Sequence, residues 1–247
     1  MQHDLAEITV AGHRCQMYEP PERHPQGWSI VFLHDVDADG LRGRAAYLEA
    51  FARYGIPCIA PLSGRSWWTE RIWNDFDPNL STERFVVDHV LPYVAERWQS
   101  HAPRAALLGI GMGGQGSLRL SFKYPHKLPI VAAVAPAIDY QLAYYDEEEQ
   151  ALRDIYSEPE AARQDTATLH VHPLNWPRNI WFAADPAGEP WFGSAERLKM
   201  KLSALGIPHD ADLETSAAGQ GSDYAERMAP RAAAYIVERL DRERRRV

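Results

Sequence analysis

The stretch that decides the fold is Leu107-Leu108-Gly109-Ile110-Gly111-Met112-Gly113-Gly114-Gln115-Gly116. An apolar strand leads into it over residues 104–110, and residues 114–122 read as the helix that follows. Strand, sharp turn and helix in this order form a nucleophile elbow, G-x-S-x-G, which lifts its central side chain above a sheet. Here the central residue is Gly111, so the pattern is complete except for its nucleophile.

Strand and helix patterns alternate along the chain, which favours a mainly parallel sheet with helices on both faces. Further strands are expected at 28–33, 57–60, 130–134, 179–184 and 210–214, and further helices at 41–54, 81–98, 194–205 and 228–242. Residues 5–10 and 13–18, joined by Ala11-Gly12, are expected to form an antiparallel hairpin at the sheet edge. The fold class is therefore α/β.

Length and composition favour one domain over residues 1–247, because 247 residues with 45% hydrophobic content can build one large α/β core. Residues 139–176 are too long for a simple connection and are interpreted as a lid-like insertion. The formal net charge of -8 argues against a general nucleic-acid binder, and the arginines at 242–246 are interpreted as a solvated helix end.

The expected compartment is the cytoplasm. The sequence shows no apolar leader after Met1, no apolar run long enough to span a membrane, and only Cys15 and Cys58 as cysteines. No membrane association is expected, a small-molecule ligand is the expected partner, and a homo-oligomer is left open.

The order of elements resembles the α/β-hydrolase fold, and within it the putative-esterase group similar to esterase D. The segment from Gly109 to Gly116 is similar to the S-M-G-G-x-G elbow of that group, and the resemblance covers nearly the whole chain. It implies a catalytic triad in the chain order nucleophile, acid and histidine.

Carried over residue by residue, the resemblance leaves two of the three catalytic groups absent. Gly111 stands at the nucleophile position, and Gln220 stands at the histidine of a segment similar to G-G-H-S-W. The acid is either Asp185 or Glu189, with a slight preference for Glu189 from its Gly-x-Pro-Trp context. The resemblance also implies an oxyanion hole formed by the backbone N–H of Met112 and the residues His34 and Asp35, which follow the third strand.

This pattern predicts a pseudo-esterase. Covalent acyl transfer needs an oxygen or sulfur nucleophile and a base near neutral pKa, and neither glycine nor a glutamine amide provides them. The amide of Met112 at a helix N-terminus would still attract an anion, so the expected ligand is a small ester or carboxylate-like molecule. No cofactor is implied. The residues expected to line its pocket are Arg65, Trp67, Trp68, Arg71, His172 and Trp191.

Two alternatives remain open. One is a hydrolase or lyase with an unconventional constellation, such as His34 or His172 with Glu189. The other is a dinucleotide site, because Gly109 to Gly114 also fits G-x-G-x-x-G and Asp139 follows a later strand. That fingerprint normally occupies the first strand-to-helix turn, whereas three expected strands precede it here.

No metal site is expected. The segment from Asp35 to Gly40 has the form D-x-D-x-D-G of a calcium loop, but the glutamate required at loop position 12 is replaced by Ala46. His170 and His172 have strand spacing, and the sequence offers no third ligand beside them.

Overall fold

The computed structural model describes residues 4–219 and 221–246 and contains an eight-stranded sheet in the order β1-β2-β4-β3-β5-β6-β7-β8. The strands are β1 Leu5–Val10, β2 His13–Tyr18, β3 Ser29–Leu33, β4 Cys58–Pro61, β5 Ala105–Ile110, β6 Ile130–Val134, β7 Asn179–Ala183 and β8 Asp210–Asp212. β1 and β2 pair antiparallel at one edge, and β4, β3, β5, β6, β7 and β8 run parallel to one another. The predicted fold class and edge hairpin are confirmed.

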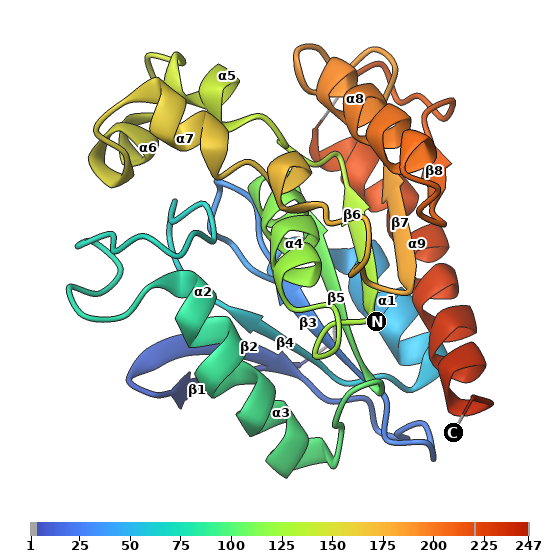
Figure 1. Cartoon of the computed structure of the whole chain (residues 1–247). Helices are drawn as coiled ribbons and strands as arrows, with labels where there is room; N and C mark the ends of the chain where they lie inside the picture. The colour runs from blue at the N-terminus through green and yellow to red at the C-terminus, as the bar shows by residue number, and fades with distance from the viewer. Residues whose placement is uncertain (1–3, 220, 247) are drawn as a thin grey trace.

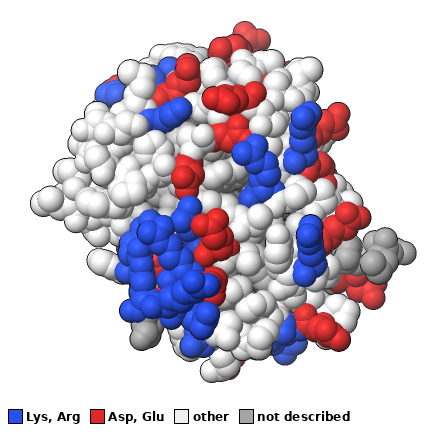
Figure 2. Space-filling view, turned by 90° about the vertical axis from the view of Figure 1, so that its right-hand side faces the viewer, with Lys and Arg blue, Asp and Glu red and all other residues white. Residues whose placement is uncertain are grey.

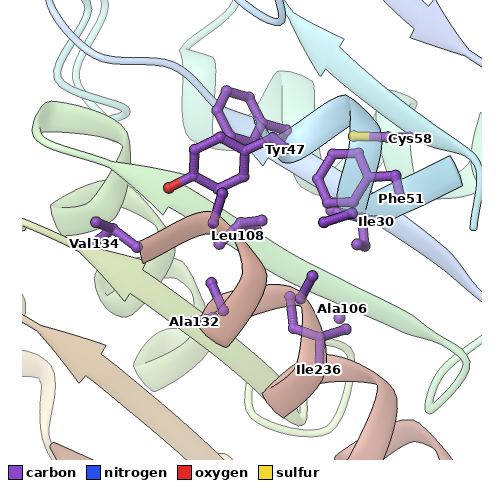
Figure 3. Close-up of a cluster of buried hydrophobic side chains, with 14 of the residues drawn as sticks. Ile30, Tyr47, Phe51, Cys58, Ala106, Leu108, Ala132, Val134 and Ile236 are labelled. Carbon is purple, nitrogen blue, oxygen red and sulfur yellow. The ribbon is translucent and has the colours of Figure 1, made fainter. Parts of the chain in front are cut away.

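Helices cover both faces of the sheet (Figure 1). The elements with helical structure outside the 139–176 insertion are α1 Ala45–Tyr54, α2 Thr82–Phe85, η1 Val86–Val90, α3 Leu91–Trp98, α4 Met112–Lys123, α8 Trp191–Ala204 and α9 Ser222–Arg244. Helices α1 and α9 pack on one face, where Tyr47, Phe51 and Ile236 meet side chains such as Ile30 and Leu108 from the sheet (Figure 3). The other face is covered by α3, α4 and α8.

Two helices that contain a proline differ from the expected ones. The helix that Ser81 caps through its hydroxyl widens into the π-helical turn η1 just before Pro92, whose ring nitrogen has no proton to donate. α9 begins six residues earlier than expected, at Ser222 instead of Met228, so Pro230 lies inside the helix.

The 139–176 insertion is more helical than its sequence suggests. It contains α5 Tyr140–Tyr144, α6 Gln150–Ile155, α7 Pro159–Gln164 and the short 3-10 helix η2 Ala167–His170. Figure 1 shows α5, α6 and α7 grouped at one end of the sheet. Buried Arg119 of α4 ties the insertion to the core, since its guanidinium pairs with Asp165 at 2.6 Å and also with buried Glu83.

Candidate functional site

The turn between β5 and α4 has the sharp backbone of an elbow. Gly111 adopts φ 53° and ψ -120°, a left-handed conformation that costs a residue with a side chain about 1 to 3 kcal/mol. Its N–H donates to Val134 O at 3.0 Å, which fixes the turn against the neighbouring strand β6. Gly109 and Gly113 let strand and helix approach closely, because a Cβ on Gly109 would lie 2.1 Å from Gly113 O.

The space above Gly111 is filled by the side chain of Asp35. A Cβ placed on Gly111 would lie 2.1 Å from both Cγ and Oδ1 of Asp35. The same Oδ1 accepts hydrogen bonds from the backbone N–H groups of Met112 and Val36, both at 2.8 Å. These two amides come from the start of α4 and from the loop after β3, and they converge on one oxygen.

The electrostatics of Asp35 follow from its enclosure. Burial raises the pKa of the Asp35 carboxyl, and the hydrogen bonds from Met112 and Val36 oppose that rise only in part. The Met112 amide, expected from the sequence to be a docking point for a ligand carboxylate, donates in this structure to the protein's own Asp35. Val36 was not identified from the sequence, because its N–H meets that of Met112 at Asp35 only in the folded chain.

The ring of His34 is held by backbone groups on both sides. Its ring is buried, Nε2 accepts from the N–H of Ser63 at 3.1 Å, and Nδ1 lies 2.7 Å from Asp35 O. A ring that accepts at one nitrogen and donates at the other is neutral, and burial lowers the pKa of His34 in the same direction. Both ring nitrogens are engaged by the backbone, so the expected oxyanion role of His34 gains no support from its side chain.

The two acid candidates are separated by burial. Asp185, just beyond β7, is 0% exposed and accepts hydrogen bonds from the N–H groups of Ala187, Ala217 and Gly219 and from the hydroxyl of Ser216, at 2.7 to 2.9 Å. Glu189 is exposed. The geometry therefore favours Asp185 over the slightly preferred Glu189.

Four hydrogen bonds control the charge of Asp185. Burial alone would raise the pKa of this carboxyl, but the donors from Ala187 and the 216–219 loop outweigh it and lower the pKa to about 2. Asp185 thereby fastens the end of β7 to the loop that leads to Gln220. Gln220 itself lies outside the described residues.

A cavity of about 330 Å³ opens above the elbow. It is lined from the core by residues that include Asp35, Gly111 and Ala135, and from the insertion by Ala143, Asp146, Glu148 and Glu149. Of the side chains expected to line a pocket, Arg65, Trp67 and Trp191 do so.

Three of the expected lining residues lie elsewhere. Trp68 is buried against His34, with ring centroids 5.0 Å apart, and its Nε1 donates to His34 O. The guanidinium of Arg71 lies over the ring of Tyr156 instead of the cavity, and His172 is exposed, with Nδ1 accepting from Leu174 N at 3.1 Å. These corrections share one reason: the sequence places a residue in a loop but does not show which way its side chain points.

Carboxylates outnumber guanidiniums around the cavity. Asp35, Asp37, Asp146, Glu148 and Glu149 contribute to the lining together with two arginines. Arg44 is buried and pairs with Asp37, while Arg65 lies 3.5 Å from Glu149. The sequence analysis did not identify this acidic lining, because the insertion and the loop after β3 meet only in the folded chain.

The acidic residues of the calcium-loop pattern and of the dinucleotide pattern contact other parts of the protein. Asp35 accepts from backbone amides, Asp37 pairs with Arg44, and Asp139 lies 3.2 Å from Arg197. Across residues 4–219 and 221–246, no three His, Cys, Asp or Glu side chains are grouped so as to hold a metal ion. In the same residues, no helix is both long and apolar enough to cross a membrane.

A protein-family comparison matches residues 16–189 to the family described as Putative esterase. No curated protein matches the sequence. Many solved structures have a similar fold. One is the fluorophosphonate-binding serine hydrolase FphF of Staphylococcus aureus, with a TM-score of 0.74, 12% identity, and coverage of 96% of this chain and 98% of the other.

Two further structures extend this similarity. An S-formylglutathione hydrolase from Agrobacterium tumefaciens has a TM-score of 0.74 at 14% identity, with 96% of this chain and 94% of the other covered. A ferulic acid esterase has a TM-score of 0.74 at 11% identity, with 97% and 100% covered. At such identities the structural similarity establishes the shared fold.

Proposed function

The chain belongs to the Putative esterase family, and we propose that it is a pseudo-esterase, which binds a small molecule in the cavity above the elbow without hydrolysing it. In this proposal Gly111 stands at the nucleophile position and Gln220 at the histidine position. The observation that carries the proposal is the Asp35 carboxylate, which fills the space that a nucleophile's side chain would need.

The chemistry of acyl transfer supports this reading. The reaction needs a nucleophile, a base that takes its proton, and donors that stabilise the oxyanion of the tetrahedral intermediate. Gly111 supplies no nucleophile, and the N–H groups of Met112 and Val36 already donate to Asp35. An ester bound here would have to displace Asp35 before its carbonyl oxygen could reach those donors.

Asp35 is a poor replacement for the missing nucleophile. Its Oδ1 occupies the two amides that an oxyanion would require, so attack by this carboxylate and stabilisation of the intermediate compete for the same donors. The alternative constellation of His34 or His172 with Glu189 gains no support either. His34 is buried with both ring nitrogens engaged, and His172 and Glu189 are exposed residues outside the cavity lining.

The acidic lining changes the expected ligand chemistry. Carboxylates accept hydrogen bonds and attract positive charge, so they disfavour the carboxylate-like ligand expected from the sequence. The cavity instead favours a small molecule that presents an N–H or O–H donor towards Asp35 while its apolar part contacts Trp67 and Trp191. In the same proposal the 139–176 insertion acts as a lid, because Ala143 and Glu149 line the cavity.

Two sets of variants test the loss of catalysis with nitrophenyl acetate. The unmodified protein and Asp35→Gly alone are expected to be inactive. Gly111→Ser with Gln220→His is expected to stay inactive, because the new Cβ meets Asp35, whereas adding Asp35→Gly to that pair is expected to restore hydrolysis. Catalytic turnover by the unmodified protein would refute the proposal.

The ligand chemistry is tested separately by thermal shift with butylamine, butanol and butyrate, which share one alkyl chain. Butylamine is expected to raise the melting temperature most and butyrate least, and Asp35→Asn is expected to reduce the difference. Stabilisation by butyrate that equals or exceeds that by butylamine would contradict the assignment of a donor-bearing ligand.

A further inference from the structure

Basic side chains gather in one patch on the face of the molecule that Figure 2 shows, although the formal net charge of the chain is -8. Guanidiniums from the end of α9 and from the residue before β7 meet on this side. Five arginines line two adjoining hollows here: Arg178, Arg239, Arg242, Arg245 and Arg246. The helix end that the sequence suggested was merely solvated is thus part of a concave surface.

The inner hollow, here called the arginine hollow, has a volume of about 220 Å³. Its lining includes the guanidiniums of Arg178, Arg239 and Arg242 and the carboxylate of Asp210, with His209 and Tyr235 beside them. Arg239 and Arg242 also line the outer hollow, where Arg245 and Arg246 are accompanied by Glu238 and Asp241.

A buried carboxylate positions the rim of the arginine hollow. Glu243 is 1% exposed, pairs with Arg178, and accepts from Arg246 Nη1 at 3.0 Å. Asn179 Nδ2 donates to the same Glu243 carboxylate at 3.0 Å. Arg178 of the arginine hollow and Arg246 of the outer hollow are therefore held in place by one group, instead of extending freely into solvent.

The other two arginines of the arginine hollow, Arg239 and Arg242, differ in how they are held. Arg239 is largely buried, lies 4.9 Å from the ring centre of Tyr235, and donates to Asp210 at 2.8 Å, while its buried Nε has no hydrogen-bond partner among the described residues. Arg242 is exposed, and within residues 4–219 and 221–246 no acidic side chain forms an ion pair with it. A fixed guanidinium and an unpaired one thus share the same hollow.

We propose that the arginine hollow binds the phosphate groups of a small anionic ligand. Guanidinium groups match phosphate oxygens with two parallel N–H donors, which makes arginine suited to this ligand class. Asp210, Glu238 and Asp241 beside the arginines, together with the net charge of -8, disfavour a long nucleic-acid backbone and favour a compact ligand with one or two phosphates. This site is independent of the cavity above the elbow.

Isothermal titration calorimetry of the whole protein with pyrophosphate, at low salt, tests the proposal. Pyrophosphate is expected to bind, and Arg242→Gln is expected to weaken its affinity about tenfold, because the loss of one charge-assisted contact has roughly this effect. Arg242 is exposed, so the variant is expected to fold, which its melting curve checks. Arg84→Gln on α2, on the opposite side of the molecule in Figure 1, is the matched control and is expected to bind like the unmodified protein.

A parallel titration with ADP distinguishes the source of the phosphates. Equal affinity for ADP and pyrophosphate would assign the hollow to the phosphate groups alone, and tighter binding of ADP would assign it to a nucleotide. The absence of binding by both ligands would overturn the proposal, and so would an affinity for pyrophosphate that Arg242→Gln leaves unchanged.

Discussion

Asp35 above the elbow and Asp185 in the loop after β7, here called the acid loop, are both carboxyl groups of the site. Their pKa values shift in opposite directions. Asp35 above the elbow accepts from two amides at one oxygen, and burial raises its pKa. Asp185 accepts four hydrogen bonds spread over both oxygens, which lower its pKa to about 2. In Asp185 the donors outweigh the effect of burial on the pKa, whereas in Asp35 the two amides do not.

Under the proposed pseudo-esterase function, this contrast gives a structural reason why the acid at position 185 would be kept while the nucleophile at position 111 is lost. Asp185 joins the end of β7 to the 216–219 loop, so its removal would affect the structure whether or not the site is catalytic. A nucleophile at position 111 would have no such structural role. Glycine there relieves a strained backbone and makes room for Asp35.

The largest expected effect comes from Asp185→Ala. The substitution leaves the partly buried N–H groups of Ala217 and Gly219 without this acceptor, so it is expected to lower the free energy of unfolding by about 3 kcal/mol. Urea denaturation measures this change. Asp185→Asn keeps an acceptor oxygen and is expected to cost less. A loss below about 1 kcal/mol in Asp185→Ala would show that the acid loop is not held in this way.

Gly111→Ala is expected to have the next largest effect. The added Cβ meets the Asp35 carboxyl and imposes a left-handed φ on a residue with a side chain, at a cost of about 2 kcal/mol. A double-mutant cycle with Asp35→Gly measures the contribution of the clash. Part of the cost is expected to disappear in the double variant, and strict additivity of the two changes would argue against contact between the residues.

The dependence of stability on pH at acid pH tests the lowered pKa of Asp185. The folded pKa of Asp185 is about 2 and its ordinary value is 3.8, so its contribution is complete above about pH 4 and is lost as the pH falls towards 2. Thermal melting of the unmodified protein and Asp185→Asn over this range is the measurement. The stability advantage of the unmodified protein is expected to shrink with falling pH, and a constant difference would contradict the lowered pKa.

Asp35→Asn is expected to give the smallest effect, with the opposite sign. Since the folded pKa of Asp35 is raised, the charged form destabilises the fold at high pH, and this cost decreases as the pH falls through the folded pKa and is gone below the ordinary value of 3.8. The variant is therefore expected to melt at a higher temperature than the unmodified protein, by a margin that grows with pH. A variant that loses stability as the pH rises, relative to the unmodified protein, would contradict this expectation.

The features that the sequence predicted correctly depend on local patterns. The edge hairpin follows from two alternating segments around Ala11-Gly12, and the end of α1 follows from Gly55, which caps it with φ 65°. The elbow turn follows from the glycines around position 111. Each of these signals lies within a few residues of the structure that it predicts.

The contacts that decide the site join distant parts of the chain and could not be predicted in this way. Asp35 reaches the amide of Met112 across 77 positions, and the insertion meets the elbow cavity only after folding. The choice between Asp185 and Glu189 depended on burial, and the orientations of Trp68 and His172 depended on packing, none of which a single sequence displays.

Hydrolysis of nitrophenyl acetate by the unmodified protein tests the central claim most directly. With the Asp35 carboxylate in the space above Gly111, the release of nitrophenol is expected to show no burst and to equal the rate in buffer alone. A burst of nitrophenol stoichiometric with protein, or turnover at about 1 s⁻¹ or faster as in ordinary enzymes, would contradict the account.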